Sequence, residues 1–300
     1  MLDICLLGTG SMMPLPYLYL TAMLARCGGS NLLIDCGEGT QVAIRAAGLG
    51  FKRIGTICLT HFHADHVAGL PGLLLTIGNS GRTEPITIIG PQYIENLVKC
   101  LCVIAPQLPY SLHFLEISTG FSHQIESLAI EALPVEHMVP CYAYRFRLSR
   151  APRFLREKAE ALGLPPRLWS RIQAGETVIH GEEKIRPEQV LGPPRQGLSL
   201  CYATDMRPSE ALVDFARSAD LFVCEGNYGD PAKREKAVLR GHCTFEEAAE
   251  MARRAEVKEL WLTHYSASMP DPETYLPLAQ AIFPHSKINA GRTTLAFPRE

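Results

Sequence analysis

The sequence lacks the features that would place it outside ordinary globular proteins. Its longest apolar runs, such as Gly72 to Ile77, are far shorter than the roughly 20 residues that cross a bilayer, so we expect no membrane span. The first residues include no basic region and only a very short apolar stretch, so we expect no export and assign the chain to the cytoplasm. The ten cysteines include no CxxC pair, which predicts buried thiols rather than a disulfide framework.

The composition indicates a folded chain with a sizeable core. Of its 300 residues, 47% are hydrophobic and 20% are charged, so one or two domains are expected. Short apolar runs bounded by Gly and Pro alternate with helical patterns, which predicts a layered α/β fold. Strands are expected at residues 3–7, 30–35, 56–59, 86–89, 128–134, 142–148, 198–203, 221–224, 259–262 and 294–297, and helices at 40–47, 67–77, 91–102, 209–217, 244–255 and 272–283.

The net charge of −2 hides an asymmetry along the chain. Between Arg145 and Arg195 there are 11 Lys or Arg against 6 Asp or Glu, and the remainder has 18 against 25. Residues 149–197 also differ in texture, with a charged helix, a Pro165-Pro166 break and a second amphipathic stretch. We interpret them as an arm inserted into a single domain that spans residues 1–300. A basic arm on an acidic body suits a polyanionic partner, although a solvated helical surface would look the same.

The segment THFHADH concentrates metal-binding side chains directly after an apolar strand. It places His61, His63, Asp65 and His66 within seven residues. Alternate residues of an extended loop point the same way, so His61 and His63 can share one metal while Asp65 and His66 turn toward a neighbouring one. Three imidazoles and a carboxylate cannot be buried together without a group that neutralises and bonds them. The segment therefore predicts a metal site.

Three further candidates follow other strand-like runs. They are His137, Asp205 and His264. Ligands at the ends of several strands would converge on one edge of a pair of sheets. Taken singly, each histidine could be a half-buried side chain, and Asp205 could cap the helix that begins near Ser209. We favour the shared site because the pattern recurs.

The order of these blocks resembles one family. GTG, DCGEGTQ, THFHADHVAGLPGLL, HMVPCYAYR, TDMRP, GHCTFEEAAEMA and LTHYS are similar to the blocks of ribonuclease Z, the tRNA 3′-processing endonuclease family of the metallo-β-lactamase fold. The resemblance implies a four-layer αββα sandwich with two Zn²⁺ ions, for which manganese or iron are alternatives. It assigns His61, His63 and His137 to one metal. It assigns Asp65, His66 and His264 to the other, with Asp205 as a bridge.

The chemistry implied by the resemblance is hydrolysis of a phosphodiester. Two metals can supply a nucleophile and clamp a phosphate, and Asp65 can act as general base as well as ligand. His242 resembles a histidine that stabilises charge on the phosphate or protonates the leaving oxygen, although it could be an ordinary residue at the start of a helix. Asp35 and Glu225 follow apolar strands and could orient the ligands or simply form turns.

The family also implies a partner and an oligomeric state. We expect precursor tRNA as substrate, a homodimer, and contacts from Arg153, Arg156 and Lys158 of the arm. Two positions depart from the family pattern, because Leu18 and Ser268 stand where arginines are expected. In the arm, Arg167 and Leu168 replace an expected Gly-Pro turn.

Three functions are therefore weighed. The first is a zinc-dependent endoribonuclease that cuts precursor tRNA at its 3′ end. The second is a hydrolase of the same fold that acts on another phosphodiester or ester, which the missing cations favour. The third, an inert RNA-binding scaffold, is disfavoured because every expected ligand is present. A β-lactamase role is disfavoured because the blocks match the nuclease branch.

Overall fold

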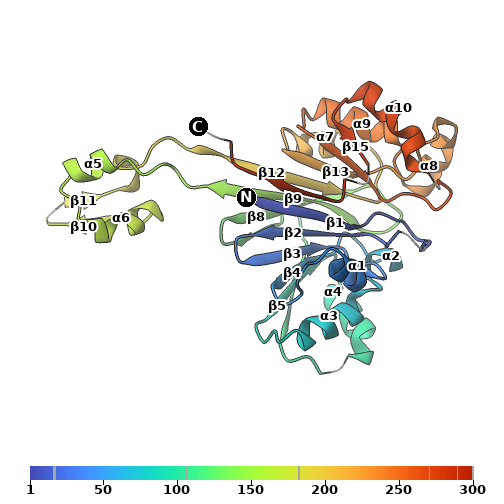
Figure 1. The fold of residues 1–300 in the computed structure, drawn as a ribbon, viewed down its shortest axis with the longest axis horizontal. Helices are drawn as coiled ribbons and strands as arrows, with labels where there is room; N and C mark the ends of the chain where they lie inside the picture. Colours follow the sequence, from blue (N-terminus) through green and yellow to red (C-terminus); the bar gives the residue numbers. More distant parts are fainter. Residues whose placement is uncertain (16–17, 106, 182, 270, 289, 299–300) are drawn as a thin grey trace.

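Two sheets packed face to face, with helices on both outer faces, form the body of the protein (Figure 1). The computed structural model describes residues 1–15, 18–105, 107–181, 183–269, 271–288 and 290–298. This arrangement is the predicted four-layer α/β sandwich. No helix in these ranges is long and apolar enough to cross a membrane.

Each sheet has seven strands. The first runs in the order β16, β1, β2, β3, β4, β5, β6, with bounds Arg292–Leu295, Leu2–Gly8, Ala22–Cys27, Ser30–Ile34, Ile54–Cys58, Ile86–Gly90 and Leu112–Glu116. The second runs β15, β14, β13, β12, β9, β8, β7, with bounds Ser286–Lys287, Leu260–Thr263, Leu221–Glu225, Arg195–Ala203, Cys141–Arg150, Leu128–Val135 and Ser122–Ile125. β3, β4, β5 and β6 are parallel neighbours, and so are β12, β13, β14 and β15.

Strand periodicity divides the core into three layers. Alternate residues of a strand face opposite sides, so Ile4 packs between the sheets whereas Cys5 packs under the outer helices. In the second sheet Tyr202 faces the first sheet, and Ala203 faces outward. Both faces of the central strands are therefore buried, which explains why they read as continuous apolar runs.

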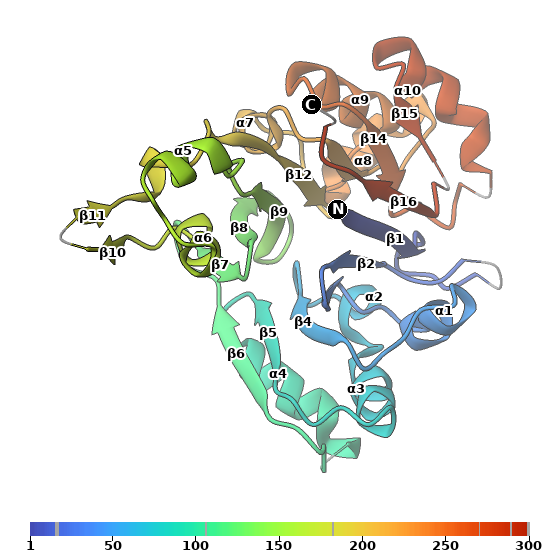
Figure 2. The same ribbon diagram turned by 60° about the vertical axis from the view of Figure 1, so that its left-hand side comes forward.

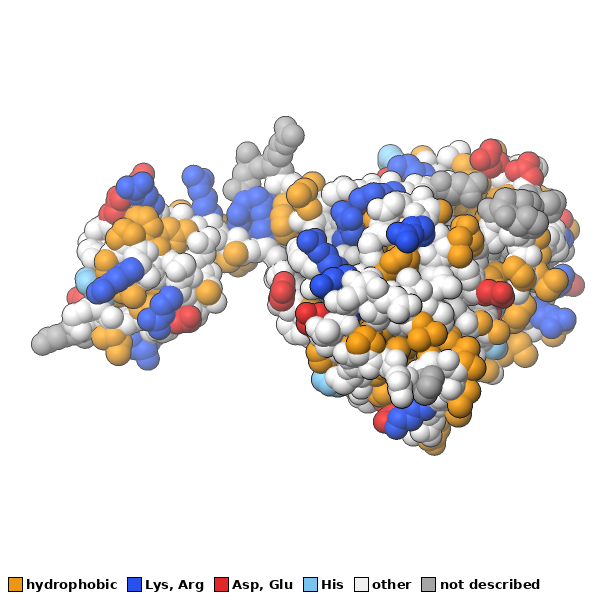
Figure 3. Space-filling view, turned by 60° about the horizontal axis from the view of Figure 1, so that its bottom comes forward, with side chains coloured by type: hydrophobic (Ala, Val, Ile, Leu, Met, Phe, Trp, Pro, Cys, Tyr) orange, Lys and Arg blue, Asp and Glu red, His pale blue; other side chains and the backbone are white. Residues whose placement is uncertain are grey.

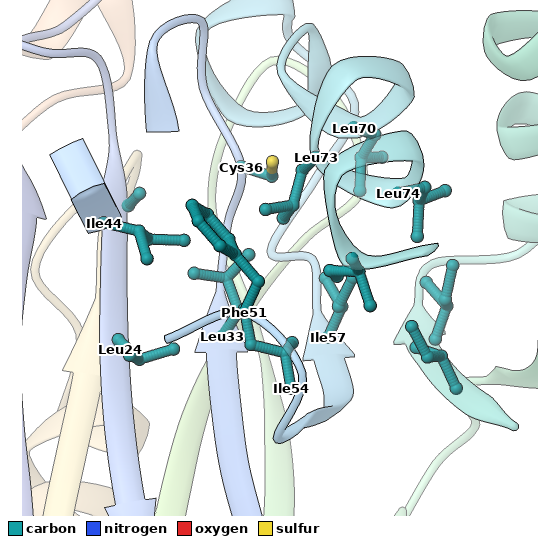
Figure 4. Close-up of a cluster of buried hydrophobic side chains, with 14 of the residues drawn as sticks. Leu24, Leu33, Cys36, Ile44, Phe51, Ile54, Ile57, Leu70, Leu73 and Leu74 are labelled. Carbon is teal, nitrogen blue, oxygen red and sulfur yellow. The ribbon is translucent and has the colours of Figure 1, made fainter. Parts of the chain in front are cut away.

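The outer layers are helical. Helices α1 (Thr40–Ala46), α3 (Leu70–Asn79) and α4 (Ile94–Leu101) cover the first sheet, where Ile44, Leu73 and Phe51 pack on Leu33 and Ile57 (Figure 4). Helices α7 (Glu210–Ala216), α9 (Phe245–Arg254) and α10 (Leu276–Ile282) cover the second sheet. Figure 2 shows these two groups of helices on opposite sides of the pair of sheets.

Two helices test the expected boundaries. The start of α9 is fixed as predicted, because Thr244 Oγ1 accepts from the Glu247 N–H at 3.2 Å and Glu247 Oε2 accepts from the Thr244 N–H at 3.0 Å. The helix expected at 67–77 is α3, which begins at Leu70, and a separate short helix that was not expected, α2 (Ala64–Val67), precedes it. The break falls at Gly69, whose N–H donates to Cys36 O at 2.9 Å and where a Cβ would lie 2.2 Å from Gly37 O.

The segment expected to be an arm projects from one end of the molecule (Figures 1 and 3). Strands β9 and β12 pair as far as Arg150 and Arg195, and beyond them lie α5 (Arg156–Ala161), α6 (Pro166–Gln173), β10 (Val178–His180) and β11 (Glu183–Ile185). These elements enclose a small core of their own around Ile172. Some of the basic charge counted in this stretch lies elsewhere, because the buried Arg145 guanidinium donates to Ser199 Oγ at 2.9 Å within the body.

Candidate metal centre

One edge of the two sheets gathers polar residues that lie within three positions after parallel strands. Asp35 follows β3, His61 follows β4, and Asp205 and His264 follow β12 and β14. Since the carboxyl ends of parallel strands share one edge, these side chains meet there. Asp65 and His66 lie in the short helix α2 and His137 in the loop between β8 and β9.

Three of these residues adopt left-handed backbone conformations. The φ angles are 56° at Asp35, 54° at Asp205 and 60° at His264. The left-handed region is energetically unfavourable for residues other than glycine. Such conformations concentrate at functional sites, where the surrounding structure holds them in place. The chain thus turns sharply where each strand ends, directing a polar side chain along the sheet edge.

One group of ligand atoms surrounds a first position. His61 Nε2 lies 2.9 Å from His63 Nδ1, and His137 Nε2 lies 3.4 Å from His63 Nδ1. Asp205 Oδ1 is 3.9 Å from His61 Nε2 and 3.7 Å from His137 Nε2. All four atoms lie within 4.8 Å of one another.

A second group lies beside the first and shares Asp205. His66 Nε2 is 3.0 Å from Asp205 Oδ2, and His264 Nε2 is 3.3 Å from the same oxygen. Asp65 Oδ2 lies 3.6 Å from His66 Nε2 and 3.3 Å from His264 Nε2. One carboxylate therefore turns an oxygen toward each group.

These groups fit divalent metal ions. Four ligands at 2.0–2.2 Å around a tetrahedral ion lie about 3.3–3.6 Å apart, close to the separations observed here. Within the described ranges, Asp65 Oδ1 is a buried side-chain oxygen that has no hydrogen-bond partner. Nitrogen and oxygen donors of this kind suit zinc, manganese or iron.

The electrostatics of the cluster also favour a cation. Burial and the charge of His66 hold the pKa of His61 well below its usual value, so this imidazole is neutral and able to act as a ligand. Burial also favours neutral His264, but the carboxylates of Asp205, Asp65 and Glu225 outweigh it and raise the pKa to about 10. The buried carboxylates thus attract positive charge, which metal ions can supply.

A buried hydrogen-bond network holds His66 at Nδ1, on the opposite side of the ring from its ligand atom Nε2. Its Nδ1 lies 2.9 Å from Asp35 Oδ2, and Asp35 Oδ1 accepts from the Thr60 N–H at 2.8 Å. The Thr60 hydroxyl lies 3.0 Å from His61 Nδ1 and donates to Asp35 at 3.0 Å. Asp35 and Thr60 therefore fix two imidazoles, in the way that outer carboxylates orient metal ligands.

Glu225 performs the same task on the second sheet. Its Oε2 lies 3.2 Å from His264 Nδ1 and 3.0 Å from His242 Nδ1, and its Oε1 accepts from the N–H groups of Met206 and Cys243 at 3.0 and 2.9 Å. The Asn227 amide also contacts His264 Nδ1, at 3.2 Å. Glu225 Oε2 therefore contacts the Nδ1 atoms of both His242 and His264.

The structure brings together every residue singled out for this site. His61, His63, Asp65, His66, His137, Asp205 and His264 form the two groups, and Asp35, Glu225 and His242 contact them. Arg153, Arg156 and Lys158 instead belong to the arm, at the opposite end of the long axis from α2 (Figure 1). Sequence analysis missed the roles of Thr60 and Asn227; Thr60 is the first residue of the THFHADH segment, whereas a single Asn after a strand gives no comparable signal.

Comparison with known proteins agrees with this architecture. A family model described as Anti-Pycsar protein Apyc1 matches residues 2–151. Proteins named Ribonuclease Z from Lachnoclostridium phytofermentans and Lachnospira eligens are 48% and 47% identical to this chain, each covering 98% of it and 97% of the relative.

Solved structures share the fold at low identity. The metallo-β-lactamase fold protein YhfI from Bacillus subtilis superposes with a TM-score of 0.69 at 18% identity, covering 97% of this chain and 96% of that one. The short form of human tRNase Z gives 0.68 at 22% identity, covering 99% of this chain and 100% of that one.

Replacing Asp35 with Ala should destabilise the protein even when metal is chelated. The change leaves the Thr60 N–H and the His66 imidazole without their buried partner, at a cost of about 2–4 kcal/mol in the free energy of unfolding. Chemical denaturation with chelator present measures this cost. Asp214→Ala, which removes a side chain that is 70% exposed, should change stability by less than about 0.5 kcal/mol. Equal losses in the two variants would contradict the role of Asp35.

Proposed function

The chain belongs to the ribonuclease Z family and is a metal-dependent phosphodiesterase of the endoribonuclease type, and on that premise we propose that it cuts precursor tRNA at the 3′ end. The observation that carries this proposal is the pair of adjacent ligand groups that share the Asp205 carboxylate. Such a pair suits hydrolysis of a phosphodiester, in which both the attacking and the leaving oxygen need stabilisation.

We assign the two ligand groups to two metal ions. His61, His63 and His137 would hold one, Asp65, His66 and His264 the other, and Asp205 both. Zinc is proposed for both positions because the ligands are imidazoles and carboxylates. When bound, the pair activates water and neutralises charge on the attacked phosphate.

Two side chains of the protein are assigned to proton transfer. The two oxygens of Asp65 suit two roles. Oδ2 lies in the ligand group, and Oδ1, which has no hydrogen-bond partner within the described ranges, can accept a proton. We propose that Asp65 accepts the proton of the attacking water. His242, held at Nδ1 by Glu225 and 18% exposed, would protonate the leaving 3′-oxygen or stabilise charge on the phosphate.

A second candidate function keeps the same chemistry on a smaller phosphodiester. Leu18 packs against the core of the second sheet, and Ser268 is a small polar residue, so neither supplies the cation expected near the phosphate. Fewer local cations would weaken binding of a polyanion without impairing hydrolysis.

The arm is proposed to bind the body of the tRNA. Arg153 and Lys158 are exposed, whereas Arg156 pairs with Glu160 at 2.6 Å and lies over the Trp169 ring at 5.7 Å. The arm projects away from the metal centre of its own chain (Figure 1). We therefore propose a cytoplasmic homodimer in which each arm serves the site of the other subunit.

Purified protein should contain close to two metal equivalents per chain. Seven ligands are too many for one tetrahedral ion, and Asp205 has an oxygen in each group. Elemental analysis after zinc-replete purification measures the ratio. A value below one equivalent would refute the paired site.

Precursor tRNA with a 3′ extension should be cut, and chelator should abolish the cut. Asp65→Ala should lower the rate at least about 100-fold, because base and ligand are lost together. Gel analysis of a labelled transcript reports both results, and a chromogenic bis-aryl phosphodiester serves as the parallel substrate. Turnover of the small ester alone would favour the second candidate function.

Removing the arm should affect only large substrates. Replacing Pro152 to Pro194 with a short glycine-rich turn joins strands that already pair at Arg150 and Arg195. Cleavage of precursor tRNA should be lost, because contacts distant from the reacting bond supply affinity and positioning. Hydrolysis of the small phosphodiester should persist.

Mixed dimers separate the two placements of the arm. An arm-deleted subunit combined with an Asp65→Ala subunit should recover one working site per dimer if each arm serves the other subunit. Continued inactivity of the mixture would place the arm's action on its own chain.

A further inference from the structure

A basic surface that the proposed mechanism does not use lies directly beside the metal centre. It is carried by the 3₁₀ turn η3 (Pro231–Lys233) and helix α8 (Arg234–Arg240). Residues 230–242 contain four Lys or Arg against two Asp or Glu. Lys233, Lys236 and Arg240 are spaced so that they share one side of the turn and helix. We call these three residues the α8 basic face.

The end of α8 is fixed to the metal centre. The Gly241 carbonyl lies 3.0 Å from His137 Nδ1, and the His242 N–H donates to Ala237 O at 2.9 Å. Gly241 has a left-handed φ of 69°, and a Cβ there would lie 3.0 Å from His137 Nδ1. The helix therefore cannot move independently of His137 and His242.

Contacts of the cations place them over the loops that flank the site. Lys236 Nζ is 5.4 Å from the centroid of the Tyr228 ring, which lies 6.4 Å from the His242 ring. Arg240 is the last residue of α8 and directly precedes Gly241 and His242. Tyr228 thus links the face to the residue assigned to the leaving oxygen.

Lys233 reaches the loop that follows His264. Its Nζ donates to Ser268 O at 3.2 Å. The same loop is tied to the start of the α8 segment, since the Gly229 N–H contacts Met269 Sδ at 3.0 Å and the Ser266 N–H donates to Asn227 O at 3.1 Å. The Lys233 ammonium group therefore lies beside Ser268, the residue that occupies the position of an expected arginine.

The neighbouring charges leave the face positive. Arg234 is directed elsewhere, with its Nε 3.5 Å from Glu247 Oε1. Asp230 accepts from the Ala232 N–H at 3.0 Å and caps the turn, and Glu235 is exposed on the helix. Among the residues that the structure describes, Lys233, Lys236 and Arg240 form no ion pair with a carboxylate.

We propose that the α8 basic face binds the phosphate backbone of an RNA substrate next to the bond that is cut. The proposal rests on the proposed function, because a polyanionic substrate is required. Lysine ammonium groups suit phosphate as mobile point charges, and they would replace the local cations missing at Leu18 and Ser268. These residues position the substrate and take no part in proton transfer.

The test uses Lys233→Gln/Lys236→Gln in the full-length, metal-loaded protein. For precursor tRNA, KM should rise on the order of tenfold with little change in kcat, and the log-log salt slope should flatten by about 0.7–0.9 per lysine removed. Fluorescence anisotropy with labelled tRNA should show the same loss of affinity. For a bis-aryl phosphodiester, which carries a single phosphate, KM should change less than twofold.

Two matched variants separate charge from structure. Lys233→Arg/Lys236→Arg keeps both charges and should retain the original KM and slope. Lys52→Gln removes an exposed lysine that precedes β4, at the opposite end of that strand from His61, and should change neither. An unchanged KM and slope in the Gln pair would overturn the proposal, as would an equal effect from Lys52→Gln. If the unaltered protein cuts no precursor tRNA, the proposed function fails first and this proposal falls with it, a result visible without any variant.

Discussion

The metal centre depends on two sheets being packed face to face, so that their carboxyl edges lie side by side. His61, His63, Asp65 and His66 come from the chain that leaves β4 in the first sheet, whereas His137, Asp205 and His264 come from the second. The apolar layer between the sheets, which includes Ile34 and Tyr202, sets their separation. A close-packed layer of this kind tolerates little change in volume, so it fixes the distance across which Asp205 must reach.

Much of this site could be predicted from the sequence, for a definite reason. A buried parallel strand reads as an apolar run, and a polar residue at its end must lie at the sheet edge, which locates His61, Asp205 and His264. Which ligands from the second sheet share a metal with which ligands from the first could be predicted only from the family resemblance. Thr60 and Asn227 were not predicted, because their roles arise from contacts with Asp35 and His264, which lie 25 and 37 positions away in the sequence. Strands such as β6, which is only half-buried, lack the continuous apolar pattern.

Helix α8 was missed for a different reason. Ala237 is its one buried residue among the described positions, so the helix has no apolar stripe from which to read a period. Its ends hold it instead, through the Asp230 cap on η3 and the left-handed Gly241. Pattern analysis finds helices that pack on a core, and it overlooks short helices that serve a surface.

The separation of the arm from the metal centre has a consequence for selectivity. The two lie at opposite ends of the longest axis, joined by the paired strands β9 and β12 (Figure 1). In the proposed homodimer, a long polyanion would contact the arm of one subunit and the metal centre of the other, whereas a short oligonucleotide would contact one of them at a time. The spacing of the two surfaces would then select substrates by their length rather than by their base sequence.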